Sequence, residues 1–523
     1  MSDAQITPTT VPETGIDADA VRSVAAILPE WLESIRATRQ LTGIQVAIWH
    51  RGELVTEVAV GPADAVQGIE LQTTHRIRIA SHSKMFCSLA VLALAERGDL
   101  RLDDQLGERV PELADAPVAD VTIRDLLSHS AGLTRDDTDA RWWQLDRPFP
   151  TRDELIEIAR TRAVVTDPGL HLQYSNIGYG LLGLVIESVT GQPFDQAVRE
   201  LVLDPVGTDG IGPDLPADAP GPEDPYGFAA GHSPLAHGDR RIVEQIPTNA
   251  LAAATGFWAT AGAIATFAGR VLCDGDLLAD RWRREMRRRV WTVGESSHYA
   301  LGLQQGELHG FAGIGHSGGF PTALTRTWAI PSERLVVSVL GTSVDAPSTD
   351  LANRILGLLA LAGGRPSPGA DSVEGEAALG GAGAGRPRPD ALAEQPTIHL
   401  ADRDLPAPAL AEVLSGSYAS LWGRVRLAVL GGRLFQVDET GTDQAGAAVE
   451  LSITGVGTDP VDGSPVVELG TWGDSGYGSW AEPMRARIET VADDRLRCSG
   501  LWDTGQLLVP SDDFTLPDRI TAP

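Results

Sequence analysis

The first feature of the sequence that could do chemistry is a solitary lysine. Of the 42 basic residues, 41 are arginine and one, Lys84, is lysine. Arginine can take over the surface roles of lysine, but it keeps its proton near neutral pH, whereas a lysine amine can lose one. The retained lysine is therefore a candidate for proton transfer. The alternative is that it is a leftover surface residue.

A serine lies three residues before this lysine. Residues 85–96 are apolar nearly all round, which predicts a fully buried helix that ends at Gly98. Ser81 and Lys84 stand at the start of that helix, and residues i and i+3 share a helix face. Burial lowers the pKa of an amine, so Lys84 could take the hydroxyl proton and activate Ser81 as a nucleophile. The alternative is a capping serine beside a lysine that reaches solvent.

Two more segments carry polar groups suited to this chemistry. Tyr174 and Asn176 open an apolar run over residues 177–186, and residues two apart on an extended segment point the same way. The tyrosine could relay protons, and the asparagine could hold a carbonyl group or the lysine. The alternative is a structural tyrosine with a capping asparagine.

The third segment is the Gly-rich stretch 315–319, which contains His316, Gly318 and Gly319 and precedes a predicted strand. Glycine permits close approach of the backbone to a ligand. The N–H of Gly319 could pair with that of Ser81 as an oxyanion hole. His129 and His171 are interpreted as satisfying local hydrogen bonds rather than binding a metal, and no metal or cofactor motif is recognised.

Composition narrows the class of protein. The 523 residues carry a net charge of −29 and a pI near 4.7, which argues against a nucleic-acid partner. A hydrophobic content of 42% is ordinary for globular protein, and no apolar run is long enough to span a membrane. The three cysteines are widely spaced, and the N-terminus is acidic and polar, so we expect a cytoplasmic protein without a disulfide framework.

Periodicity predicts the elements that position these residues. Residues 17–39 predict an amphipathic helix that Pro29 kinks or interrupts. Residues 44–49 and 54–60 predict a hairpin, and residues 323–330 and 335–340 predict two further strands. Residues 100–290 are mostly helical in pattern, and a helix near 351–359 follows the last strands. The simplest packing is an α+β fold with an antiparallel sheet covered by helices, plus a helical lobe.

The C-terminal part differs in composition. Residues 363–397 are rich in Gly, Pro and Ala and predict a flexible linker. Residues 398–523 show short alternating runs with Gly turns, which predict a small all-β domain, a barrel or sandwich. The predicted organisation is thus a catalytic domain over 1–362, the linker, and this β domain.

Taken together, the segments Ser81-x-x-Lys84, Tyr174-x-Asn176 and His316-x-Gly318 resemble the three motifs of penicillin-recognising serine hydrolases. The second motif resembles the class C β-lactamase branch, and the histidine of the third resembles D-aminopeptidases and related esterases. Residues 121–133 are very like a conserved stretch of the same family. The resemblance covers roughly residues 20–362 and implies a β-lactamase/transpeptidase-like fold. The β domain resembles, more loosely, the extra barrels of long members.

The resemblance implies an acyl-enzyme mechanism without cofactor or metal. Ser81 would attack an amide, short-peptide or ester carbonyl, Lys84 and Tyr174 would share the acid–base work, and Asn176 would orient the substrate. His316 would line the opposite wall, where relatives carry a lysine, so strong recognition of a free carboxylate is not expected. The alternatives are a carboxylesterase or transacylase, and a non-catalytic sensor that resembles penicillin-binding proteins. A homo-oligomer is compatible with each of these functions.

Three further segments carry patterns that resemble other kinds of site. Residues 315–319 also match the G-x-S-x-G nucleophile elbow, but that elbow needs a helix after Ser317, and Pro321 with the alternation of Thr325 and Thr327 favours a strand there. Residues 473–476 resemble a chymotrypsin-type nucleophile loop and are interpreted as a surface turn. The arginine-rich residues 281–289 are interpreted as a solvated helix face, with a docking patch for an acidic partner as the alternative.

Overall fold

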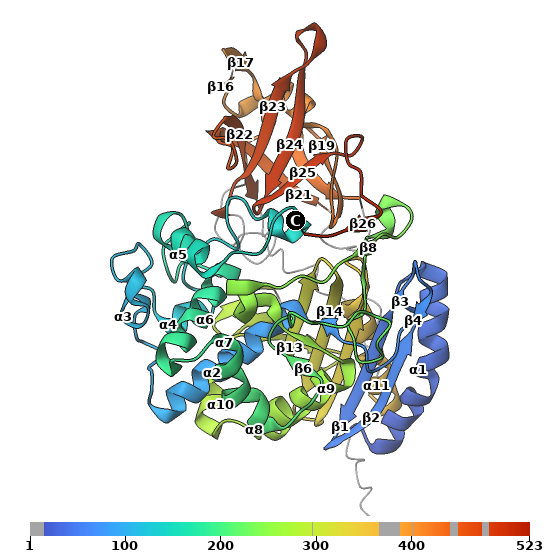
Figure 1. Cartoon of the computed structure of the whole chain (residues 1–523). Helices are drawn as coiled ribbons and strands as arrows, with labels where there is room; N and C mark the ends of the chain where they lie inside the picture. The colour runs from blue at the N-terminus through green and yellow to red at the C-terminus, as the bar shows by residue number, and fades with distance from the viewer. Residues whose placement is uncertain are drawn as a thin grey trace, which may run out of the picture.

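The computed structural model describes residues 15–294, 296–365, 388–400, 402–439, 448–472 and 481–522. Figure 1 shows two parts, a sheet covered by helices and a barrel that stands on one side of it. We call the part that contains residues 15–294 and 296–365 the sheet domain. The predicted fold class, an α+β sheet with a helical lobe and a C-terminal barrel, is confirmed by this architecture.

An eight-stranded sheet forms the centre of the sheet domain, in the order β10-β11-β12-β13-β14-β15-β1-β2 with antiparallel neighbours. Two of its interior strands, β15 and β1, are buried along their whole length, as expected for apolar strands covered on both faces. The strands are β1 (Ile44–His50), β2 (Glu53–Val60), β10 (Trp291–Thr292), β11 (Ser297–Tyr299), β12 (Gln304–Leu308), β13 (Phe311–Phe320), β14 (Ala323–Ile330) and β15 (Leu335–Gly341).

Helices from the two ends of the sheet domain cover one face of the sheet. Helix α1 (Ala18–Arg39) and helix α11 (Ser348–Ala362) pack there around an apolar cluster that includes Val21 and Leu28. Of the two expected effects of Pro29 on the first helix, a kink or an interruption, the interruption is excluded, because α1 runs through Pro29 as one helix. A proline removes one hydrogen bond to the preceding turn, and buried residues on both sides of it, Leu28 and Leu32, hold the helix on the sheet.

The other face carries the helical lobe, whose apolar core surrounds helix α2 (Ser83–Arg97), which is buried from Ser83 to Ala95. This helix ends at Gly98, in the left-handed conformation predicted for a C-cap. The remaining α-helices are α3 (Leu106–Arg109), α4 (Ile123–Leu127), α5 (Arg152–Thr161), α6 (Asn176–Thr190), α7 (Phe194–Val198), α8 (Asp204–Val206), α9 (Ala261–Ala268) and α10 (Asp280–Met286). The short strands of the sheet domain are β3 (Pro62–Asp64), β4 (Ile69–Glu70), β5 (Ile77–Arg78), β6 (Ile211–Gly212), β7 (Gly231–His232), β8 (Ile242–Val243) and β9 (Trp258–Ala259).

The C-terminal part is a closed eight-stranded barrel, so the sandwich alternative for this part is wrong. Its inward-facing residues form a separate apolar cluster, to which helix α12 (Ala407–Leu414) contributes. The barrel strands are β18 (Gly416–Ser420), β19 (Gly423–Leu430), β20 (Arg433–Asp438), β21 (Ala448–Thr458), β22 (Pro465–Trp472), β23 (Met484–Thr490), β24 (Leu496–Asp503) and β25 (Gln506–Pro510). The hairpin of β16 (Ile398–Leu400) and β17 (Arg403–Leu405) precedes them.

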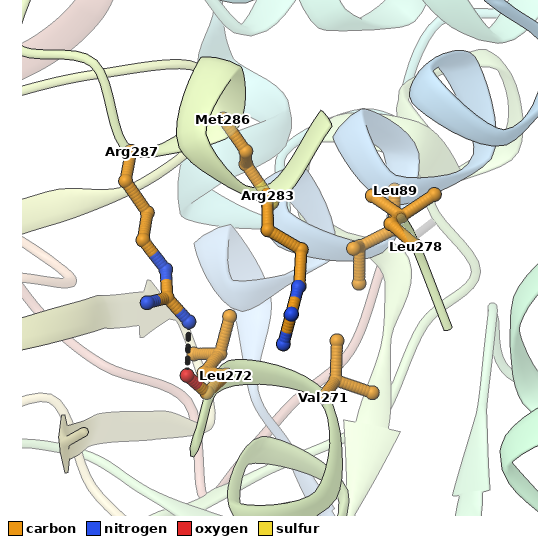
Figure 2. Close-up of a pocket in the computed structure, with 7 residues that line it drawn as sticks. All are labelled: Leu89, Val271, Leu272, Leu278, Arg283, Met286 and Arg287. Atoms are coloured by element: carbon orange, nitrogen blue, oxygen red, sulfur yellow. Dashed lines mark hydrogen bonds between the residues drawn. The ribbon is translucent and has the colours of Figure 1, made fainter. Parts of the chain in front are cut away.

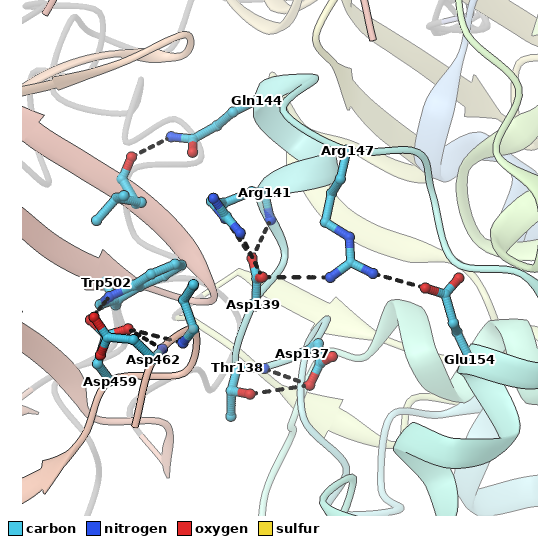
Figure 3. Close-up of polar contacts among 12 residues, drawn as sticks. Asp137, Thr138, Asp139, Arg141, Gln144, Arg147, Glu154, Asp459, Asp462 and Trp502 are labelled. Carbon is cyan, nitrogen blue, oxygen red and sulfur yellow. Dashed lines mark hydrogen bonds and ion pairs between the residues drawn. The ribbon is translucent and has the colours of Figure 1, made fainter. Parts of the chain in front are cut away.

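The barrel is joined to the sheet domain by the loop over residues 134–150 and by the end of the chain. Gln144 Nε2 donates to the Leu507 carbonyl at 2.7 Å, and the Arg141 guanidinium lies 5.8 Å from the Trp502 ring centre (Figure 3). Strand β26 (Arg519–Ile520) returns to pair in parallel with β8. At the barrel tip, Leu421 is buried in the same cluster as the lobe core, so the two parts share apolar contacts.

The predicted domain boundaries and linker stay predictions. Residues 366–387 of the linker lie outside the described residues, while Leu392 near its end is buried against the barrel core. No helix in the described ranges is long and apolar enough to cross a membrane.

The arginine-rich stretch begins on α10 and continues past its end, and two of its six arginines form ion pairs with residues that the structure describes. Arg283 and Arg288 pair with acidic residues three positions away, and Arg287 donates to the Leu272 carbonyl. Figure 2 shows Arg283 and Arg287 bordering a small hollow whose apolar lining includes Leu89 and Val271. Its volume of about 10 Å³ leaves room for at most one water molecule, so it holds no substrate.

Candidate active site

Ser81 lies on a single 3-10 turn, η1 (Ala80–His82), that runs directly into α2. Ala80 adopts a left-handed φ of 45°, which is rare for a residue with a side chain and often marks a functional turn. This turn leaves Ser81 half-buried while its neighbours His82 and Ser83 are fully buried. The hydroxyl of Ser81 is therefore the accessible one at the start of the helix.

Lys84 is fully buried, and its amine contacts three oxygen atoms. Nζ lies 3.2 Å from Ser81 Oγ, 2.7 Å from Asn176 Oδ1 and 2.9 Å from the Ala254 carbonyl oxygen. Burial lowers the pKa of Lys84 well below its usual value, which the nearby carboxylate of Asp136 only partly offsets. A neutral amine has two N–H donors and one lone pair. With Asn176 and Ala254 accepting the two donors, the lone pair is left to face the Ser81 hydroxyl.

Tyr174 lies on the other side of the nucleophile candidate, in hydrogen-bonding contact with Ser81. Its ring centre is 4.6 Å from Lys84 Nζ, and burial raises the pKa of its phenol above the usual value. The phenol is therefore protonated across the physiological pH range. The sequence placed Tyr174 and Asn176 at the start of an apolar run, and the structure places them at the N-terminus of α6, where Ser175 caps the helix through the N–H of Gly178.

No sequence motif pointed to Asp136, which hydrogen-bonds the Asn176 side chain on the side away from Lys84. Its Oδ1 accepts from Asn176 Nδ2 at 2.8 Å, so the opposite end of that amide, Oδ1, faces Lys84. Asp136 is buried, which raises the pKa of its carboxyl, and Arg135 Nε lies 3.5 Å from its Oδ2. Asp136 thus fixes the orientation of the Asn176 amide and places one acidic group near the lysine.

The third segment, residues 315–319, lies on strand β13 and forms one wall of the candidate site. Gly318 packs so closely that a Cβ there would collide with the Ile79 carbonyl oxygen. A Cβ on Gly319 would lie 3.5 Å from the Trp422 ring of the barrel tip, and Trp422 Nε1 donates to the Trp143 carbonyl at 2.7 Å. The wall is thus built from both parts of the chain. The predicted oxyanion hole of Ser81 and Gly319 stays a prediction.

His316 belongs to a buried chain of hydrogen bonds that fixes its tautomer. The N–H of Ser175 donates to His129 Nδ1 at 3.1 Å, so the proton of this neutral ring is on Nε2, which donates to the Tyr299 hydroxyl at 3.2 Å. That hydroxyl in turn donates to His316 Nε2 at 3.1 Å. The proton of His316 is then on Nδ1, which donates to the Ser317 carbonyl at 2.6 Å.

The imidazoles of His129 and His316 are both neutral. Burial is the main cause that lowers the pKa of His129 and that of His316 well below the usual value. The wall formed by His316 therefore presents no fixed positive charge to a substrate, as the sequence indicated. His129 does satisfy local hydrogen bonds, and no group of three or more His, Cys, Asp or Glu side chains in the described part of the chain is arranged to hold a metal ion.

The structure also decides one rival site. Ser317 lies within strand β13 and the strand β14 follows it, as the sequence predicted, so the nucleophile-elbow alternative is excluded. The glycine-rich stretch 473–476 lies outside the described residues. The residues brought together are thus Ser81, Lys84, Tyr174, Asn176 and His316, with Asp136 and Tyr299 behind them.

Comparison with known proteins identifies the family. A model of the family described as beta-lactamase matches residues 28–362. The chain belongs to the beta-lactamase family. This beta-lactamase match contains every candidate residue of the site, from Ser81 to Gly319.

Beta-lactamase-family relatives with curated descriptions match shorter stretches. "Protein flp" of Staphylococcus aureus (strain MW2) is 30% identical over 174 residues, which are 32% of this chain and 34% of the relative. "Esterase EstB" of Burkholderia gladioli is 31% identical over 223 residues, 39% of this chain and 54% of the relative. "Penicillin-binding protein 4" of Amycolatopsis lactamdurans is 29% identical over 181 residues, 34% of this chain and 46% of the relative. The chain thus spans between a third and just over half of these proteins.

Solved structures of the beta-lactamase fold resemble the chain over a greater length. The structure titled "Crystal structure of SurE" covers 94% of this chain and is covered completely, with a TM-score of 0.56 and 23% identity. An octameric penicillin-binding protein homologue from Pyrococcus abyssi also covers 94% and is covered to 99%, with a TM-score of 0.56 and 20% identity. D-amino acid amidase from Ochrobactrum anthropi SV3 covers 66% and is covered to 98%, with a TM-score of 0.55 and 21% identity. At these identities the likeness concerns the fold.

Proposed function

We propose that the protein is a serine hydrolase that forms an acyl-enzyme on Ser81. The observation that carries the proposal is the set of contacts at Lys84, whose amine has two acceptors for its two N–H groups and the Ser81 hydroxyl at 3.2 Å for its lone pair. A neutral amine in hydrogen-bond reach of a hydroxyl is the arrangement that general-base activation requires.

The proposed reaction divides the proton transfers between two residues. Ser81 Oγ attacks the substrate carbonyl carbon while its proton passes to Lys84 Nζ, and the carbonyl oxygen becomes an oxyanion near the N–H groups of Ser81 and Gly319. The phenol of Tyr174 protonates the leaving nitrogen or oxygen as the carbonyl–leaving-group bond breaks, and it regains a proton from Lys84. Water then cleaves the ester bond to Ser81 with the same groups in reverse.

Tyr174 is assigned the acid role because burial raises the pKa of its phenol, whereas burial lowers that of the Lys84 amine. Asn176 would orient the substrate and hold Lys84, and the wall of His316, Gly318 and Gly319 would bind the acyl group. Because His316 is neutral, this wall suits uncharged groups. We therefore propose small amides, short peptides, including those with D-residues, and esters as substrates.

Two other functions remain as alternatives to hydrolysis of amides. One is a carboxylesterase or transacylase that uses the same acyl-enzyme, and the other is a non-catalytic sensor that binds ligands in the same site. The curated relatives include an esterase and a penicillin-binding protein, and each name applies to that protein only. A homo-oligomer and a cytoplasmic location also stay predictions; light scattering and cell fractionation test them.

The experiment that tests the proposal is labelling with a fluorophosphonate followed by mass spectrometry. We expect one adduct, on Ser81, and none in Ser81→Ala, while Ser34→Ala on the outer helix α1 labels like the wild type. Lys84→Arg should label at least about 100-fold more slowly, because an arginine keeps the charge but gives up no proton. Labelling of Lys84→Arg at the wild-type rate would contradict the proton role of Lys84. A full panel of p-nitrophenyl esters and aminoacyl p-nitroanilides without any turnover would favour the sensor.

A further inference from the structure

One carboxylate of the barrel reaches into the sheet domain beside the candidate site. Glu482 lies just before strand β23, and its side chain is half-buried. Its oxygens accept from three groups of the sheet domain: the Thr134 hydroxyl, the Arg135 backbone N–H at 3.0 Å and Gln173 Nε2 at 2.9 Å. The barrel thus contacts the chain directly before Asp136 and directly before Tyr174.

These donors belong to two segments, 134–136 and 173–176, that are hydrogen-bonded to each other. Ser175 Oγ donates to the Thr134 carbonyl at 2.6 Å, and the N–H of Asn176 donates to the Arg135 carbonyl at 2.7 Å. The side chains of Asp136 and Asn176 add a third link at 2.8 Å. Segments 134–136 and 173–176 therefore form one paired unit. Glu482 is bound to both halves of it, on the side that faces the barrel.

We propose that Glu482 is a positioning residue, by which the barrel holds Tyr174 and Asn176 in place against Ser81 and Lys84. This inference rests on the proposed function of that site. Its physical basis is that a carboxylate can accept several hydrogen bonds at once, so one side chain ties two segments that no covalent bond joins. On this proposal, the barrel helps to position the side chains that take part in the reaction.

A direct contact of Glu482 with substrate is less consistent with these bonds. Both of its oxygens already accept from the sheet domain, one from Thr134 and the other from Arg135 and Gln173. The charged groups that face it are Arg135 and Asp136, and burial raises the pKa of Glu482 to about 7. If Glu482 takes up a proton, its O–H can donate to the Thr134 hydroxyl, which is able to accept, while the other two bonds persist.

This hydrogen-bond pattern predicts which variants keep the geometry. In Glu482→Gln, the amide N–H can donate to Thr134 while the amide oxygen accepts from Arg135 and Gln173, so the unit stays tied. In Glu482→Ala, all three donors lose their partner. A matched control is Gln144→Ala, which removes a hydrogen bond between barrel and sheet domain, to the Leu507 carbonyl, without touching either segment.

The test combines steady-state kinetics on p-nitrophenyl butyrate with hydrogen exchange of the whole protein. For Glu482→Ala we expect kcat to fall on the order of 10- to 100-fold with KM within about twofold, because a misplaced acid–base group slows the chemical step. Peptides that contain residues 134–136 and 173–177 should exchange faster. Glu482→Gln and Gln144→Ala should resemble the wild type in both measurements.

Two results would overturn the inference: a folded Glu482→Ala protein with wild-type kcat and exchange, or equal losses in Gln144→Ala, which would assign the effect to docking in general. If the wild type shows neither turnover nor Ser81 labelling, the proposed function fails. The exchange comparison then still decides whether Glu482 orders the two segments.

Discussion

Replacing Asp136 by asparagine isolates the electrostatic part of the proposed mechanism. Asp136 Oδ1 lies 2.8 Å from Asn176 Nδ2, and Asn176 Oδ1 lies 2.7 Å from Lys84 Nζ. An asparagine at 136 can still accept from Asn176 through its amide oxygen, so the orientation of that residue is kept. The substitution therefore removes a negative charge while it changes the shape of the site little.

The magnitude follows from these distances. Across the Asn176 amide, the carboxylate oxygen and the amine are separated by roughly 6–7 Å, and two unit charges at that separation interact by about 2–3 kcal/mol at an effective dielectric constant near 20. This energy corresponds to a shift of about 1.5–2 pKa units, as an upper limit because burial raises the pKa of Asp136 itself. The carboxylate stabilises the ammonium form of Lys84, so its removal lowers the pKa of Lys84 further.

The assay is the second-order rate of fluorophosphonate labelling between pH 5 and pH 10, which needs no knowledge of the substrate. The active form has a neutral Lys84, so the acidic limb of the profile should move to lower pH in Asp136→Asn. The matched control is Asp137→Asn, which breaks the neighbouring ion pair with Arg162 and should leave the limb in place. An acidic limb that stays fixed or moves to higher pH in Asp136→Asn would refute the assignment of Lys84 as the base.

Two further substitutions test the surroundings of the site. Tyr299→Phe leaves the facing nitrogens of His129 and His316 without their partner, so we expect the free energy of unfolding to fall by about 2–4 kcal/mol in calorimetry, and an unchanged melting temperature would contradict the hydrogen-bond chain. Trp422→Ala removes the barrel ring beside Gly319, so the ratio of kcat/KM for bulky over small p-nitrophenyl esters should rise on the order of tenfold. A constant ratio would show that Trp422 does not limit the acyl pocket.

Local sequence spacing predicted the part of the site formed by the η1 turn and the first turn of α2. The approach of Lys84 to Ser81 depends on a one-turn separation and on the burial of α2, and both can be inferred from residues 81–98. Tyr174 and His316 were found through resemblance to known motifs. Their position relative to Ser81 depends on the packing of α6 and β13 around α2, which no local pattern specifies.

Long-range contacts account for what the sequence did not predict. Asp136 contacts Asn176 across 40 residues, and Glu482 contacts Gln173 across 309, in each case through a hydrogen bond between polar residues of common types. Tyr299 is one tyrosine at the end of a short strand, and its partner His129 lies 170 residues earlier. Pro29 does not interrupt α1 for the same reason, because packing on the sheet outweighs one missing helical hydrogen bond.

The solitary lysine allows the central claim to be measured directly. In protein grown with ε-¹⁵N lysine, the side-chain amine of Lys84 is the single labelled site, so one resonance reports its protonation without assignment. We predict that this resonance titrates well below the ordinary lysine pKa of about 10.4 and that Asp136→Asn lowers its midpoint further. An amine that stays an ammonium ion up to pH 10 would contradict the account.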